Sequence, residues 1–244
     1  GNLSSRGGAV RHAHANKSKT FGYKINVKYN EGNDFGLDLV EDAERISTFY
    51  TTIVQPKITN KVVDGTQTGT PLLTMSDLDT NNDGNPMASE YQNLAMNAHF
   101  EFRPNENTTA TFSWGFSDAG GIGIQDLGYF YNQGLDYWAH ARVASGNIFA
   151  QISYNSNDGG DIDNPSFLYE TGNRVVGKRE FLVANVQYDL DLPSFLDSKF
   201  NFGIDYQDTA SDSEYTLYGR NEDNDPYSIA GAYAQGQSKL ADNL

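Results

Sequence analysis

The chain has 244 residues, a formal net charge of −15, and only 38% hydrophobic residues. A soluble domain contains roughly 45–50% apolar residues, so core material is scarce, yet the 13% of aromatic residues is well above what disordered segments carry. The acidic balance excludes nucleic acid as an expected partner, because phosphates would be repelled, and no apolar run reaches the roughly 20 residues of a membrane helix.

Apolar and polar residues alternate along most of the chain, which predicts strands with two different faces. In chain order, the predicted strands cover residues 3–15, 20–30, 91–103, 108–117, a segment ending near 144, then 147–156, 180–191, 199–207 and 228–240. The segment 20–30 is typical: one face carries Phe21, Tyr23, Ile25, Val27 and Tyr29, and the other carries Lys24 and Lys28. Further charged positions predicted on the polar faces are Glu101, Arg103, Asp136, His140, Arg142, Asp189 and Asp205.

The connections between these strands alternate between short and long. Tight turns are predicted at 16–19, 104–107, 145–146 and 192–195, and long connections at 31–90, 118–133, 157–179 and up to Tyr227. Bacterial outer-membrane barrels have short periplasmic turns, long extracellular loops, an apolar outside and a polar interior. The sequence therefore predicts an all-β, antiparallel transmembrane β-barrel segment over residues 1–244, with 31–90 as a long extracellular loop.

Four tyrosines lie near predicted strand ends, where apolar bands meet polar residues: Tyr29, Tyr154, Tyr188 and Tyr206. Their rings suit an aromatic girdle at the lipid headgroups. The ordinary preference of tyrosine for strands explains the same positions.

The sharpest local motif runs from Asp79 to Glu90. It follows the calcium-loop spacing D-x-[DN]-x-[DN]-G-x5-E, with Asp79, Asn81, Asp83 and Asn85 as oxygen ligands and Glu90 as the closing bidentate carboxylate. No flanking helices are evident, and a polar Asn/Asp cluster in a loop is the alternative. Calcium is the one cofactor that the sequence suggests.

The remaining groups of polar residues match no clear metal-binding or catalytic motif. His12 and His14 share a strand face and could bind a metal, although polar residues lining the barrel interior are the simpler interpretation, as they are for His99 and His140. No nucleophile elbow and no phosphate loop in a strand-to-helix context occurs. The chain is not expected to be an enzyme.

Several segments resemble one protein family in the order in which the family has them. These are Val10-Arg11-His12-Ala13, Lys19-Thr20-Phe21-Gly22-Tyr23-Lys24-Ile25, Arg103-Pro104-Asn105-Glu106-Asn107-Thr108-Thr109, Gly219-Arg220-Asn221-Glu222-Asp223-Asn224-Asp225 and Gly231-Ala232-Tyr233-Ala234-Gln235. They resemble barrel strands, a periplasmic turn and a loop of TonB-dependent outer-membrane receptors, particularly the Bacteroidetes-type members. The resemblance spans nearly the whole chain.

The resemblance implies energised uptake of a large, scarce ligand (a siderophore, vitamin, glycan or peptide) across the outer membrane of a Gram-negative bacterium. It also implies energy from the TonB system through a plug domain. Neither a plug nor a TonB box is found here, and about nine strands are predicted where the family barrel has about 22. We therefore interpret the chain as an N-terminal portion of the barrel without the plug.

Two other function classes remain open at this point. A small structural or adhesive outer-membrane barrel would show the same alternation. A soluble calcium-binding, lectin-like β protein would account for the acidic loops and the calcium motif. Acidic loops can also serve solubility alone.

Overall fold

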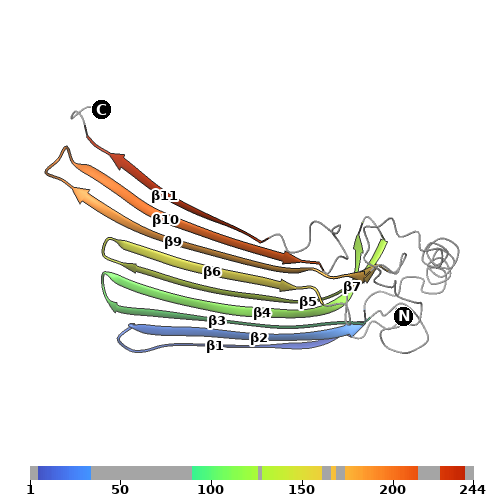
Figure 1. The fold of residues 1–244 in the computed structure, drawn as a ribbon. Coiled ribbons are helices and arrows are strands. Elements are labelled where there is room, and N and C mark those ends of the chain that lie inside the picture. Colours follow the sequence, from blue (N-terminus) through green and yellow to red (C-terminus); the bar gives the residue numbers. More distant parts are fainter. Residues whose placement is uncertain are drawn as a thin grey trace, which may run out of the picture.

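The protein is described here from a computed structural model, which covers residues 5–33, 90–125, 128–160, 166–168, 174–213 and 226–239. These residues form one antiparallel sheet, and no helix occurs among them (Figure 1). The strands are β1 (Ser5–Ala15), β2 (Phe21–Asn33), β3 (Glu90–Asn105), β4 (Thr108–Gln125), β5 (Gly128–Ser145), β6 (Ile148–Asp158), β7 (Ser166–Leu168), β8 (Arg174–Val175), β9 (Lys178–Leu192), β10 (Ser198–Asp212) and β11 (Tyr227–Gln237).

Nine long strands lie side by side in the order β1-β2-β3-β4-β5-β6-β9-β10-β11, each antiparallel to its neighbours. The turns that follow β1, β3, β5 and β9, called the short turns below, all lie at one end of the sheet (Figure 1), whereas β4 and β5 meet at the opposite end, where Gln125 pairs with Gly128. The order follows the chain because each short turn leads directly back along the preceding strand. The prediction of an all-β antiparallel fold is confirmed, and the sheet is an open arc within the described residues.

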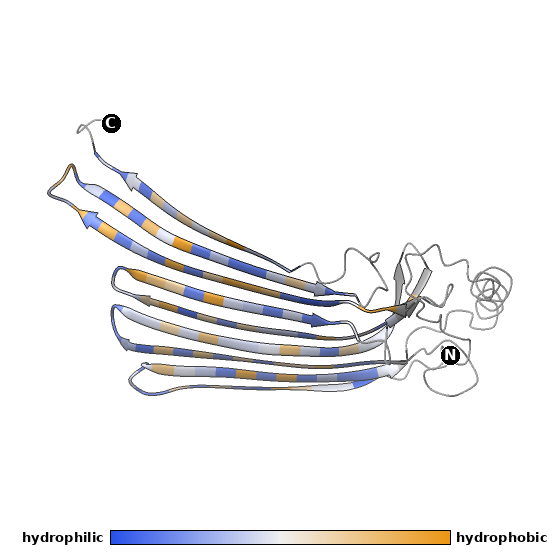
Figure 2. Cartoon of the chain, in the orientation of Figure 1, coloured by the Kyte–Doolittle hydropathy of each residue, from blue (hydrophilic) through white to orange (hydrophobic). Residues whose placement is uncertain are grey.

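The register keeps like residues in the same row across the sheet. Phe21 lies opposite Phe102, Tyr23 opposite Phe100, and Val27 opposite Met96. Side chains on a strand alternate between faces, so this register collects the apolar side chains of successive strands on one face, which we call the outer face. The charged positions predicted for the polar faces lie in rows on the opposite side, the inner face. The alternation is visible as successive orange and blue bands along the strands (Figure 2).

One prediction about the connections is wrong. Residues 118–133 were expected to form a glycine-rich loop, but β4 and β5 continue through this region and pair as far as Gln125 opposite Gly128. The long connection predicted over 157–179 does separate β6 from β9. It contains the short strands β7 and β8, and β7 pairs with β5 through Phe130 opposite Leu168. Glycine weakens a strand without preventing it, and the long partner strand supplies the backbone hydrogen bonds.

The outer face is not covered by a second layer of described residues. Each strand contacts only its neighbours in the sheet, and only two apolar side chains among the described residues, Ala98 and Val176, are buried. Large apolar side chains in the centre of the outer face remain open, with Val186 53% and Ile204 62% exposed. Within these parts of the chain, the apolar rows therefore have no intramolecular core.

Candidate functional surfaces

The centre of the outer face is a continuous apolar surface that crosses the sheet. One row runs Val27, Met96, Phe116, Tyr137, and another runs Ile25, Ala98, Trp114, Ala139, Tyr154. Aromatic rings are in contact along it: the centroids of Trp114 and Tyr137 lie 6.2 Å apart, and those of Tyr137 and Tyr154 lie 6.0 Å apart. Such edge-to-face contacts hold rings in place even when one side of the sheet is open.

Tyrosine hydroxyls meet carboxylates toward the end of the outer face where the long connections lie. Tyr29 donates to Glu31, which also accepts from Arg6 on β1. Tyr154 donates to Glu180 on β9 at 3.1 Å, and Tyr206 donates to Asp208 at 3.2 Å. Three of the four tyrosines singled out from the sequence therefore have their rings among apolar side chains and their hydroxyls on charged groups.

The fourth tyrosine of that set, Tyr188, lies toward the opposite end of the outer face. It is opposite Phe202 on β10 and Ile148 on β6, close to the short turns. The tyrosines thus mark both ends of the apolar surface. The carboxylate partners were missed from the sequence, although the spacing Tyr-x-acid in Tyr29/Glu31 and Tyr206/Asp208 is a readable signal.

The inner face carries a network of polar side chains that bond across strands. Asn26 Nδ2 donates to Asn97 Oδ1 at 2.6 Å, and Asn185 Nδ2 donates to an oxygen of Asp205 at 2.7 Å. The His99 Nδ1 and the Ser113 hydroxyl are 2.7 Å apart. These bonds link side chains of neighbouring strands, and much of the surface remains open to water. An inner face of this kind suits contact with water and polar solutes.

Two aromatic rings of the inner face lie over glycines of the neighbouring strand. A Cβ added to Gly115 would be 2.8 Å from Trp138 Nε1, and one added to Gly203 would be 2.2 Å from Tyr233 Cζ. Glycine allows this close approach, because it has no side chain to occupy the space under the ring. These pairs depend on register between strands and were not predicted from the sequence.

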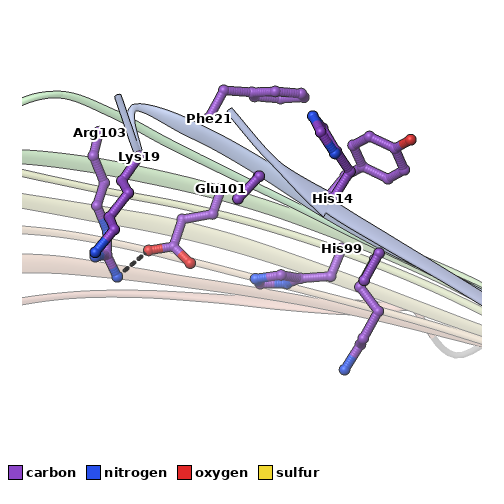
Figure 3. A pocket seen from close by; sticks show the side chains of 11 residues that line it. His14, Lys19, Phe21, His99, Glu101 and Arg103 are labelled. Atoms are coloured by element: carbon purple, nitrogen blue, oxygen red, sulfur yellow. Dashed lines mark ion pairs between the residues drawn. The ribbon is translucent and has the colours of Figure 1, made fainter. Parts of the chain in front are cut away.

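A pocket of about 520 Å³ lies at the short-turn end of the sheet, beside β1. Lys19, His99, Glu101 and Arg103 line it from one side of the ribbon, and His14 and Phe21 lie on the other side (Figure 3). Glu101 forms an ion pair with Arg103, while Lys19 adds a further positive charge. The cations of this corner favour contact with an anionic group.

The two histidines near the start of the chain do not line the polar side. His12 lies opposite Ile25, and His14 lies opposite Tyr23, so both are on the outer face. Their rings are 5.5 and 6.1 Å from the Tyr23 ring. The expectation that they share a face is confirmed, and the expectation that this face is the polar one is wrong. Pairing of Val10 with Val27 fixes which side each residue of β1 takes.

His99 and His140 are on the inner face, as expected. Lys24 lies opposite His99, His99 opposite Ser113, and Ser113 opposite His140. Nowhere in the described part of the chain do three or more His, Asp or Glu side chains gather in a way that could hold a metal ion. The predicted calcium ligands Asp79, Asn81, Asp83 and Asn85 lie outside the described residues; Glu90 is the first residue of β3.

No protein family matches the sequence, and no curated protein is significantly similar to it. Within the described ranges there is no helix of the length and apolarity that would cross a membrane.

Proposed function

We propose that the chain forms part of the wall of an outer-membrane β-barrel, with lipid against its outer face and water against its inner face. The observation that supports the proposal most is the uncovered apolar face, which runs across the nine-strand sheet back to back with a charged one. Apolar patches of soluble monomers rarely exceed a few hundred Å². Lipid would remove these apolar side chains from water, because acyl chains would cover them in place of a second protein layer.

The directions of the strands determine how such a barrel can close. Nine strands that alternate in direction leave β1 and β11 running the same way. Antiparallel closure therefore needs an odd number of further strands between them. A second copy with its long connections on the same side would place its β1 parallel to β11, so we propose that additional strands of the same polypeptide complete the wall.

The proposed activity is that of a TonB-dependent receptor: energised uptake of a large, scarce ligand such as a siderophore, vitamin, glycan or peptide. Its support is the sequence resemblance, together with an inner face of polar side chains and long connections at one end. Ligand would be captured by those connections, and the TonB system would act through a plug domain. Calcium would bind in the loop 79–90.

Growth measurements test the uptake proposal. A strain of the source bacterium lacking the gene is compared with its parent on iron chelates, cobalamin, oligosaccharides and peptides, each as the limiting nutrient. We expect the deletion to slow growth on one class of nutrient and a plasmid copy of the gene to restore that growth. Uptake of the same nutrient by the parent strain should stop when a protonophore is added. Equal growth on every class would favour the structural or adhesive barrel.

Extraction separates the membrane proposal from the soluble alternative. We expect the complete polypeptide in the outer-membrane fraction, released only by detergent. Recovery in aqueous buffer as a monomer would favour the lectin-like protein.

A further inference from the structure

An aromatic side chain is followed two residues later by a carboxylate on three strands of the outer face. The pairs are Tyr29 and Glu31 on β2, Phe116 and Asp118 on β4, and Tyr206 and Asp208 on β10. On β6, Tyr154 reaches its carboxylate across the strand gap, at Glu180. In each case the carboxylate is farther from the short turns than the ring. An aromatic row therefore separates the apolar centre from an acidic row.

This aromatic row does not follow the hydrogen-bonded rows of the sheet. The row through Tyr29 passes through Leu94, Asp118, Leu135, Asp158, Lys178 and Asp212. Relative to it, Phe116, Tyr154 and Tyr206 lie two, four and six residues closer to the short turns. They lie on β4, β6 and β10, which are two, four and six strands away from β2. The slant is therefore one residue per strand.

The starts of the strands at the short-turn end are displaced along the sheet by the same amount per strand. A second hydrogen-bonded row joins Tyr23, Phe100, Phe112, Ala141, Ile152, Ala184 and Tyr206. β2 begins at Phe21, two residues before this row, and β10 begins at Ser198, eight residues before it. The difference is six residues over six strands. The aromatic row and the starts of the strands thus give the same slope.

We propose that the aromatic row lies at the boundary between hydrocarbon and headgroups of the bilayer leaflet on the long-connection side, and that the strands cross the membrane obliquely. This inference rests on the proposed membrane function. A slant of one residue (about 3.3 Å) per strand spacing (about 4.8 Å) corresponds to a tilt of about 35°. That value lies in the range of roughly 35–45° that closed barrels require. The carboxylates and tyrosine hydroxyls then contact headgroups and water, and the rings contact the upper acyl chains.

Depth measurements decide between the slanted row and the hydrogen-bonded row. The chain has no cysteine, so spin labels can be placed singly by Tyr23→Cys, Tyr29→Cys and Tyr206→Cys in the complete polypeptide, reconstituted in phosphatidylcholine vesicles. Collisions with oxygen and with a water-soluble nickel complex report the depth of each label. The slant predicts equal depth for positions 29 and 206, with position 23 about 16 Å away toward the other leaflet (six residues of strand at a tilt of about 35°).

The outcomes separate this inference from the membrane proposal. If position 206 matches position 23, the strands run along the membrane normal and the slant is wrong, while lipid exposure stands. If all three labels collide with nickel and none shows enhanced oxygen contact, the membrane function itself is wrong. Phe116→Cys and Ile148→Cys repeat the comparison without removing a tyrosine: position 116 should match 29, and position 148 should match 23.

Discussion

At the residue scale, the Trp138 ring on β5 lies close over Gly115 on β4. Gly115 is buried on the inner face, and a methyl group there would meet Trp138 Nε1 at 2.8 Å and the Met96 carbonyl oxygen at 2.9 Å. The carbonyl belongs to the backbone of β3 and has no freedom to rotate away. The sheet must therefore shift, or the ring must leave.

Gly115→Ala is predicted to lower the free energy of unfolding by about 1–3 kcal/mol, the usual cost of forcing an extra methyl group into a packed position. Urea unfolding in detergent, followed by tryptophan fluorescence, measures the change. Gly231→Ala is the matched control, because an added Cβ there has no heavy atom within 4 Å. Equal destabilisation by both substitutions would show that the ring contact has no energetic weight.

A second residue-scale prediction contrasts the two faces at neighbouring positions. Val186 is on the outer face and 53% exposed, and Asn185 is on the inner face beside Asp205. In lipid, Val186→Arg places a charge near the bilayer midplane and should cost about 2–4 kcal/mol. Asn185→Arg adds the same charge in water beside a carboxylate and should be nearly neutral. Refolding yields and unfolding free energies in vesicles measure both, and a reversed order would refute the assignment of faces.

Alternation along the sequence was sufficient to assign most residues to a face, because side chains on a strand must alternate. It failed for His12 and His14, whose polarity suggested the inner face, while the pairing of Val10 with Val27 places them outside. The ring-on-glycine contacts were beyond prediction, because they depend on register between strands whose offset no single segment encodes.

At the element scale, the glycines between residues 118 and 133 were misleading. Glycine has a low strand propensity because it loses more backbone freedom on folding, which suggested a loop. In the structure β4 and β5 continue together to Gln125 and Gly128. Pairing with a long neighbouring strand outweighs local propensity, and propensity measured on isolated segments does not contain this effect.

The connection that contains the calcium motif is predicted to bind the ion through the oxygen ligands of the motif. Calcium titration followed by calorimetry should give one site in the complete polypeptide, and Asp83→Ala should abolish it, because Asp83 supplies one of the ligating carboxylates. Asp64→Ala, an acidic position of the same connection outside the motif, is the control. Unchanged binding in Asp83→Ala would leave the motif as a polar loop.

At the scale of the whole molecule, the sheet has no intramolecular partner for its apolar side among the described residues. The sequence predicted the strands and their faces because both follow from short-range patterns. The slant of one residue per strand, and the shared direction of β1 and β11, became evident only from the pairing of all nine long strands. The proposals on what completes the wall and on how it meets a bilayer rest on these two properties.

We propose that neighbouring residues of one strand contact lipid and water in turn, and a scan of spin labels along β2 measures this alternation position by position. Single cysteines from Tyr23 to Tyr29 are spin-labelled in the reconstituted complete polypeptide, and collisions with oxygen and with a water-soluble nickel complex are measured at each position. Collisions with oxygen should be most frequent at positions 23, 25, 27 and 29, and collisions with nickel at 24, 26 and 28. If nickel reaches both faces, or if the pattern has no period of two, the outer face does not contact lipid.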